Sequence, residues 1–222
     1  WLLGSDNKSG FLPNDWTTNT GMHRSAKEGN LEDVRMYLEH LRHDKNPVAK
    51  GEKGKGYTPQ HVAARFGHLN VVQLIQTTTG LVNPANANGW TVLHTAAYNG
   101  HLKIVKELIK DLDNKNPVAT GFFNLTPIHN AANKGHLELV KFFCQIIPDI
   151  TMVDSQFGFN ALHFAAFNGH LEVVKFLSDI ISIDIIDKNG KTACEVAKSK
   201  GHQSIFDYLS LHYCLIEFFT VI

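Results

Sequence analysis

Residues 126–140 read TPIHNAANKGHLELV, and this stretch decides the fold because the chain repeats it. The three strongest further copies read TPQHVAARFGHLNVV, TVLHTAAYNGHLKIV and NALHFAAFNGHLEVV. Successive copies start 38, 33, 35, 34 and 32 residues apart, so the chain is an array of units of about 33 residues. Two weaker copies, at Thr20 and Thr192, flank these four, so the chain has six copies. Besides the copy at Thr126, they begin at Thr20, Thr58, Thr91, Asn160 and Thr192.

Each copy carries the signals of two short helices in succession. In the copy at Thr58, a threonine that can cap a helix precedes Pro59 at the first helical position. An Ala-Ala pair keeps the first helix narrow, and the second segment is apolar on one face. One such helix pair cannot bury its own apolar face, so the copies are expected to stack. The glycines expected to end the first helices in the left-handed conformation are Gly29, Gly67, Gly100, Gly135, Gly169 and Gly201.

The pattern Thr-Pro-x-His-x-Ala-Ala at this period resembles the ankyrin repeat. The resemblance implies an all-α ankyrin-repeat solenoid of stacked helix-turn-helix pairs with β-hairpin-like connecting loops. It covers residues 15–211, between an N-terminal flank at 1–14 and a hydrophobic C-terminal tail at 212–222. The six repeats are expected at 15–52, 53–85, 86–120, 121–154, 155–186 and 187–211.

The chain has 13 histidines, which raises the question of a metal site. Ten of them recur once per repeat at two positions, so they are spread along the array and do not converge on one ion. In the sixth copy Glu195 replaces the first of these histidines, and a Glu three residues after Thr192 forms a capping box. We therefore expect histidine there to have the same structural role. His40 and His43 form a lone H-x-x-H, for which metal binding is a minor alternative.

Composition and missing motifs exclude several classes of function. Lys+Arg and Asp+Glu each number 21, so the net charge is zero, unlike that of a strongly basic nucleic-acid-binding domain. Base stacking of single-stranded nucleic acid on aromatic side chains stays a weak alternative. The sequence has no Gly-rich phosphate loop, H-E-x-x-H or G-x-S-x-G, so we expect no enzyme, catalytic residue, cofactor or small-molecule substrate. Three cysteines are too few for a disulfide scaffold and fit a reducing compartment.

In ankyrin arrays the loop tips and the last turns of the first helices share a concave face, where the resemblance implies that a partner binds. The 25 such positions of repeats two to six include nine aromatic residues and six Lys or Arg, but no Asp or Glu. We expect a non-enzymatic interaction module or adaptor that binds an acidic protein segment with apolar anchors. The expected partner-binding residues are Arg65, Phe66, Trp90, Tyr98, Phe122, Phe123, Lys134, Phe157, Phe159, Phe167 and Lys191.

An alternative for these aromatic residues is that several pack between neighbouring loops and are buried. Alanine at Trp90 or Phe159 would then weaken folding rather than binding. The resemblance also implies one modification site, because Asn83 lies where asparagine hydroxylases modify ankyrin arrays.

The tail HYCLIEFFTVI at 212–222 is unusually apolar after a polar helix. It is the start of a membrane segment, an amphipathic tail packed on the last repeat, or a wrongly assigned coding end. Because the chain begins with Trp1 and not Met, we expect a processed chain or a fragment of a larger protein, such as a membrane channel or an acyltransferase that carries ankyrin repeats. The start lacks a secretory signal, so the expected location is the cytoplasm, with the nucleus as the alternative.

Overall fold

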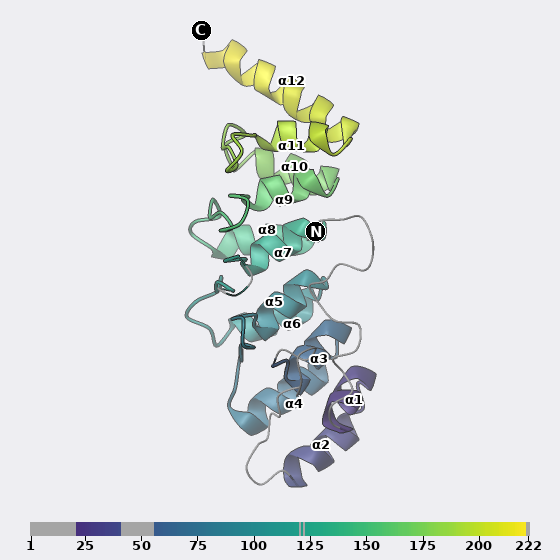
Figure 1. Ribbon diagram of the computed structural model, residues 1–222. Helices are drawn as coiled ribbons and strands as arrows, with labels where there is room; N and C mark the ends of the chain where they lie inside the picture. The colour runs from purple at the N-terminus through teal and green to yellow at the C-terminus, as the bar shows by residue number, and fades with distance from the viewer. Residues whose placement is uncertain (1–20, 41–55, 120, 122, 221–222) are drawn as a thin grey trace. The chain divides into compact units, whose positions relative to one another are not determined.

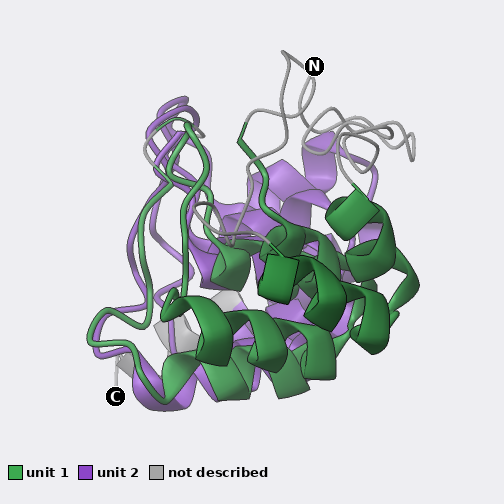
Figure 2. Ribbon diagram, turned by 90° about the horizontal axis from the view of Figure 1, so that it is seen from below, with its two compact units in different colours: residues 1–122 green, residues 123–222 purple. Residues whose placement is uncertain are grey.

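The structure is a computed structural model that describes residues 21–40, 56–119, 121 and 123–220, with side chains as far as His212. The contacts within the chain divide it into two compact units, unit 1 at residues 1–122 and unit 2 at residues 123–222. Figure 2 shows them in green and purple, each with its connecting loops on one side of its helices.

Unit 1 is a stack of three helix pairs. The first helices of its repeats pack in the order α1, α3, α5, and the second helices in the order α2, α4, α6 (Figure 1). Both rows are in chain order, so consecutive repeats are neighbours in space. The helices are α1 Gly21–Glu28, α2 Leu31–His40, α3 Pro59–Phe66, α4 Leu69–Thr79, α5 Val92–Tyr98 and α6 Leu102–Ile109.

Unit 2 repeats this arrangement with three more pairs. Helix α9 packs between α7 and α11, and α10 contacts both α8 and α12. The helices are α7 Pro127–Asn133, α8 Leu137–Ile146, α9 Ala161–Phe167, α10 Leu171–Ser178, α11 Ala193–Ser199 and α12 Gln203–Thr220. The described elements of both units are helices, joined by loops with isolated β-bridges at Ala85–Thr91 and Ile186–Thr192. The expected all-α repeat fold with hairpin-like loops is confirmed.

The helix signals of the sequence act as expected. Thr58 caps α3 with Pro59 at its first position, and Gly67 ends that helix in the left-handed conformation with φ of 83°. Gly67 is required for a second reason, because a Cβ there would lie 2.8 Å from the ring of His101 in the next repeat. The Ala pairs are fully buried, so neighbouring first helices pack closely.

The first histidine of a repeat also bonds to a backbone carbonyl of a loop further along the chain, which for His61 belongs to the next repeat. His61 Nδ1 accepts a hydrogen bond from the Thr58 backbone N–H at 3.2 Å, which forms the expected capping box. The proton of the neutral ring is therefore on Nε2, which donates to the Trp90 carbonyl at 3.0 Å. His129 repeats both bonds in unit 2, with the Met152 carbonyl as acceptor at 2.8 Å. The structural role is confirmed, and the sequence did not reveal this second bond.

The second histidine of each repeat bonds in the opposite direction along the chain. His101 Nε2 donates to the Arg65 carbonyl at 2.9 Å, and His170 Nε2 donates to the Asn133 carbonyl at 3.0 Å. These carbonyls belong to the last turn of the preceding first helix, where backbone acceptors lack partners within the helix. The second histidine position therefore joins a repeat to the one before it within a unit.

The expected tail does not form an element of its own. Helix α12 continues through residue 212 and ends at Thr220. The boundary that we expected at residue 211 therefore falls inside a helix. In the part of the chain that the structure describes, no helix combines the length and the apolar character that crossing a bilayer requires.

The loop of the fourth repeat has an unusual backbone. Phe123 and Asn124 both have left-handed φ values, 58° and 59°. In the neighbouring loops a glycine takes the left-handed position, at Gly89, Gly158 and Gly190. Two left-handed residues in succession are typical of a type I′ turn, for which Asn-Gly is the preferred pair. A bulky phenylalanine held in this region costs of the order of 1 kcal/mol.

We expect Phe123→Asn to raise the free energy of unfolding by about 1 kcal/mol, because asparagine tolerates left-handed backbone far better than phenylalanine. Phe123 is half-buried, so the substitution removes only part of a packed surface. Chemical denaturation measures the change, and Asn124→Ala serves as the opposite control, with an expected loss of stability. A lower stability for Phe123→Asn would show that the packing of this ring outweighs its backbone strain.

Candidate functional site

An aromatic row in unit 2 joins a loop to the end of a first helix. The ring of Phe159 lies 5.4 Å from that of Phe157 in the same loop and 5.8 Å from that of Phe167 at the end of α9. Phe159 is only 4% exposed and also packs edge-on against Phe164. The expectation that Phe159 is an exposed anchor is therefore wrong: this ring is core and holds the loop on α9. Phe157 and Phe167 are half-buried and keep an accessible surface.

Lysine ammonium groups lie next to this aromatic row. Lys200 Nζ is 4.1 Å from the centre of the Phe167 ring, a cation–π contact from the next repeat. Lys188 donates from Nζ to the Ser155 carbonyl, and its backbone N–H donates to the Phe157 carbonyl at 2.8 Å. We call the group of accessible residues the aromatic–lysine surface, which consists of Phe157, Phe167, Lys188, Lys191 and Lys200.

Two aspartates of the same loops, Asp154 and Asp187, point inward and bond to the backbone of the loops. Asp154 is 2% exposed, and its two carboxylate oxygens accept the backbone N–H groups of Phe159 and Gln156, each at 2.7 Å. Asp187 is 7% exposed and likewise accepts the backbone N–H of Lys191 at 2.9 Å. Both carboxylates therefore shape the loops from inside, whereas Asp184, nearer the start of the last loop, is exposed.

Two asparagines lie beside Phe167 on neighbouring first helices. Asn168 Nδ2 donates to Asn133 Oδ1 at 2.7 Å and to the Phe164 carbonyl at 2.9 Å. Both side chains are half-buried. The amide pair therefore connects the ends of α7 and α9 at the edge of the aromatic–lysine surface.

Unit 1 has a corresponding aromatic contact, with its loop residue also buried. Trp90 is 1% exposed, its Nε1–H donates to Thr95 Oγ1 at 3.0 Å, and its ring lies 6.1 Å from that of Tyr98. The expectation of an exposed anchor at Trp90 is wrong for the same reason as at Phe159. Tyr98 is half-buried.

The accessible cation–aromatic group of unit 1 is at the end of α3. Phe66 is 39% exposed, with the Arg65 guanidinium 5.6 Å and the Lys27 ammonium 5.7 Å from its ring centre. Arg65 is half-buried, and burial lowers its pKa while the nearby hydroxyls of Tyr57 and Tyr98 raise it. This group resembles the aromatic–lysine surface in chemistry but is smaller.

The comparison with known families agrees with this geometry. The family model for ankyrin repeats (3 copies) matches residues 22–120, 110–184 and 128–217, well over half of the chain. The chain belongs to the ankyrin-repeat family. No curated protein matches it at a significant level. Ankyrin repeats are in general protein–protein interaction modules, and the family is typically non-catalytic.

The remaining residues that we expected to bind a partner or to be modified differ in their surroundings. Phe122 lies outside the described residues. Lys134 is half-buried, and its charge lowers the pKa of His170 in addition to the larger effect of burial. Asn83, the expected modification site, uses its Oδ1 to accept the Leu93 backbone N–H at 2.8 Å. Its modification stays a prediction.

Sequence reasoning placed four further residues on the concave side without assigning them to binding. Their repeat positions were the available signal, but the contacts that distinguish them lie between repeats: Lys200 over Phe167, and Asn168 against Asn133. The four residues are Asn133, Asn168, Lys188 and Lys200.

Of the two histidines considered for metal binding, the described residues include only His40. His40 Nδ1 contacts the Met36 carbonyl at 2.7 Å, whereas His43 lies outside the described residues. Within the described ranges, no three His, Cys, Asp or Glu side chains cluster as metal ligands would.

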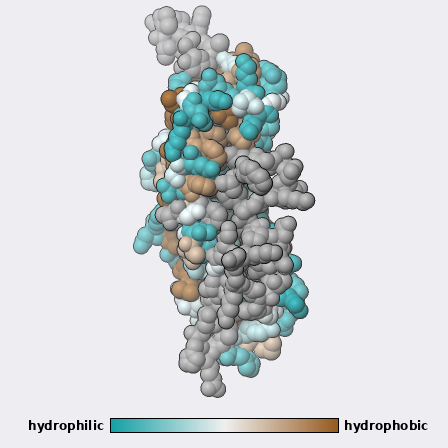
Figure 3. Space-filling view, viewed as in Figure 1, coloured by the Kyte–Doolittle hydropathy of each residue, from teal (hydrophilic) through white to brown (hydrophobic). Residues whose placement is uncertain are grey.

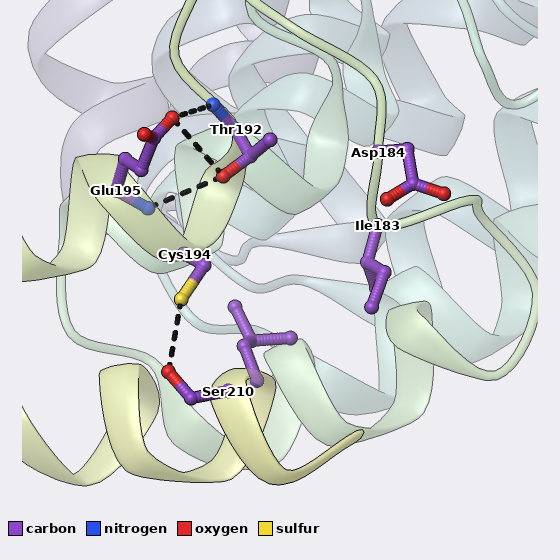
Figure 4. Close-up of a pocket in the computed structure, with 7 residues that line it drawn as sticks. Ile183, Asp184, Thr192, Cys194, Glu195 and Ser210 are labelled. Carbon is purple, nitrogen blue, oxygen red and sulfur yellow. Dashed lines mark hydrogen bonds between the residues drawn. The ribbon is translucent and has the colours of Figure 1, made fainter. Parts of the chain in front are cut away.

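A pocket of about 500 Å³ lies in the last ankyrin repeat, between the start of α11 and α12 (Figure 4). Four of its polar residues form two bonded pairs: Glu195 accepts the Thr192 backbone N–H at 2.9 Å, and Cys194 Sγ contacts Ser210 Oγ at 3.4 Å, whereas Asp184 lines the other side. In the second repeat the corresponding position, Gln60, is bonded to the loop that follows α4, through the Val82 carbonyl. In the last repeat α12 continues in place of such a loop, so no described loop covers the start of α11. We therefore attribute the pocket to the position of this repeat at the end of the array.

A second pocket of about 500 Å³ lies between α8 and α10 on the outer helices. It is lined mainly by apolar side chains, among them Ile147, Phe176 and Ile180. Burial raises the pKa of the Cys144 thiol in this pocket to about 11. The thiol is therefore protonated near neutral pH and is a poor nucleophile. On the face shown in Figure 3, brown apolar residues are interspersed with teal polar ones where the residues are coloured.

Proposed function

We propose that this chain is a non-enzymatic adaptor whose unit 2 binds an acidic protein segment with apolar anchors on the aromatic–lysine surface. The observation that carries the proposal is the Lys200 ammonium, 4.1 Å from the accessible ring of Phe167, beside loops in which Asp154 and Asp187 point inward. A partner carboxylate beside Lys200 and an apolar side chain against Phe167 would complement this surface.

The charges of the outer helices support the choice of face. On α8 and α10, Lys141 and Lys175 are paired with Glu138 and Glu172 at 3.0 and 2.8 Å. The lysines on that side are therefore already neutralised by neighbours three residues away. Lys191, by contrast, is exposed in the last loop. An acidic segment gains more from the aromatic–lysine surface than from the outer helices.

Selection from a displayed library of random peptides tests this proposal. We expect the selected peptides to combine Asp or Glu with aromatic or aliphatic residues. Lys200→Glu is expected to weaken their binding about tenfold or more, because it replaces an attraction with a repulsion. Phe167→Ala is expected to weaken it by a similar factor through loss of the apolar contact.

Lys175→Glu is the matched control, because it makes the same charge change on the outer face of the same unit. Its expected effect on affinity is less than about twofold, since an exposed pair contributes little. Failure to select any acidic peptide, or equal losses for Lys200→Glu and Lys175→Glu, would overturn the proposal. Tight binding of single-stranded oligonucleotides in preference to peptides would favour the nucleic-acid alternative instead.

A further inference from the structure

The orientation of the two amides beside Phe167 is fixed by their bonds. The Phe164 carbonyl can only accept, so the atom of Asn168 that faces it at 2.9 Å must be Nδ2. That same Nδ2 contacts Asn133 at 2.7 Å, so Asn133 must present Oδ1. The opposite ends of the pair are then a donor, Asn133 Nδ2, and an acceptor, Asn168 Oδ1.

These two end atoms have no protein partner among the described residues. The hydrogen bonds of Asn133 use its Oδ1 and its backbone carbonyl, the latter bonded to His170 Nε2. Those of the Asn168 side chain use only Nδ2. Neither end atom is among the buried polar atoms without a partner, so both reach the surface. The pair therefore presents one free donor and one free acceptor where α7 and α9 end.

The same position in unit 1 shows which part of this arrangement is special. Asn99 there also donates from Nδ2, to the Thr95 carbonyl at 2.8 Å, so this bond is a common way to end the first helix. The repeat before Asn99 has Arg65 where the repeat before Asn168 has Asn133. The special feature of unit 2 is therefore Asn133, which pairs with Asn168 and leaves Asn133 Nδ2 and Asn168 Oδ1 without a protein partner among the described residues.

We infer that the Asn133–Asn168 pair binds the backbone of an extended partner segment: Asn133 Nδ2 donates to a backbone carbonyl, and Asn168 Oδ1 accepts a backbone N–H. An extended strand presents N–H and C=O groups along the same edge, which matches one donor beside one acceptor. The inference rests on the proposed function and deepens it. Phe167 and Lys200 select the side chains of the segment, and the amide pair holds its backbone.

The test uses the acidic peptide with the highest affinity from the library selection and a set of variants in which each backbone amide in turn is replaced by an ester. An ester removes one N–H and weakens the adjacent carbonyl as an acceptor. We expect one or two neighbouring ester positions to weaken binding to the unmodified protein about fivefold, the typical effect of one hydrogen bond.

Asn133→Asp keeps an oxygen for Asn168 Nδ2 but replaces the free donor with an acceptor. With this variant the cost of the ester that weakens the carbonyl bonded to Asn133 is expected to fall below about twofold, because that bond is already lost. The ester that removes the N–H bonded to Asn168 Oδ1 is expected to keep its cost. Asn189→Asp is the matched control, since Asn189 is an exposed residue of the last loop and gains the same charge. It is expected to retain the fivefold cost.

The two proposals fail in different ways. If no acidic peptide is selected, the proposed function is overturned. If a peptide binds with the expected dependence on Phe167 and Lys200, but no ester costs more than about twofold, only the inference about the amide pair is overturned. If Asn133→Asp leaves the cost of every ester the same as in the unmodified protein, the inference is overturned as well.

Discussion

Trp90→Ala is expected to lower the free energy of unfolding of unit 1 by about 3–5 kcal/mol, the usual cost of emptying a buried aromatic site. Trp90 is 1% exposed and packs against Tyr98 and His94. The substitution also leaves Thr95 Oγ1 without the indole N–H that it accepts at 3.0 Å. Phe159→Ala is expected to have an effect of similar size in unit 2, because Phe159 is 4% exposed and contacts the rings of three phenylalanines and of His163.

Chemical denaturation followed by circular dichroism measures both losses. Phe66→Ala is the control, because Phe66 is 39% exposed and its truncation is expected to cost less than about 1 kcal/mol. If Trp90→Ala were as stable as Phe66→Ala and weakened peptide binding instead, the result would contradict the structural role of Trp90 and show that it is a binding anchor.

The stability of the folded chain is expected to fall steeply as the pH drops below about 6.5. Burial lowers the pKa of His61 and of His129 from the ordinary 6.5 to about 4. Between these values the unfolded chain binds a proton at each site that the folded chain does not, so acid favours unfolding. Each of the two residues is expected to remove about 2 kcal/mol between about pH 7 and about pH 5.

Other histidines act in the same direction. Burial also lowers the pKa of His23 in unit 1 and of His163 and His170 in unit 2. Protonation at Nδ1 would also end the capping-box bond, in which the His61 nitrogen accepts the Thr58 N–H at 3.2 Å. The loss of stability in acid is therefore distributed over both units.

Denaturation midpoints at several pH values test this expectation, with His129→Gln as the matched variant. Glutamine at the third helical position keeps a capping box but does not titrate. The variant is expected to be less stable near pH 7, because the Met152 carbonyl loses its donor. Its free energy of unfolding is also expected to change less with pH, by the contribution of one histidine. A free energy of unfolding that does not change between about pH 7 and about pH 5 would contradict the role given to these rings.

The repeat pattern predicts most of the fold, because its signals are local. The Thr58 cap, Pro59 and Gly67 act on their own helix, and Glu195 in the last copy correctly indicates what the first histidines do. What the local pattern could not show is the second bond of such a histidine, since its acceptor is far along the chain, as for His61 and the Trp90 carbonyl, 29 positions away.

The candidate site was less predictable, because burial in a loop depends on which way the chain folds. Phe157 and Phe159 are two residues apart in one loop, yet the first is half-buried and the second is core. The rings differ because Phe159 packs on Phe164 and Phe167 of α9. The cation–π contact of Lys200 and the bond between Asn133 and Asn168 likewise join residues more than 30 positions apart. No pattern within one repeat reveals such pairs.

Hydrogen–deuterium exchange of the whole chain, with and without the selected acidic peptide, tests the central claim most directly. The claim is that a partner segment binds the loops and first-helix ends of unit 2. We expect the peptide to slow exchange in residues 155–168 and 187–201, which carry the aromatic–lysine surface and the ends of α9 and α11. Slower exchange confined to the outer helices, α8 and α10, would contradict this account.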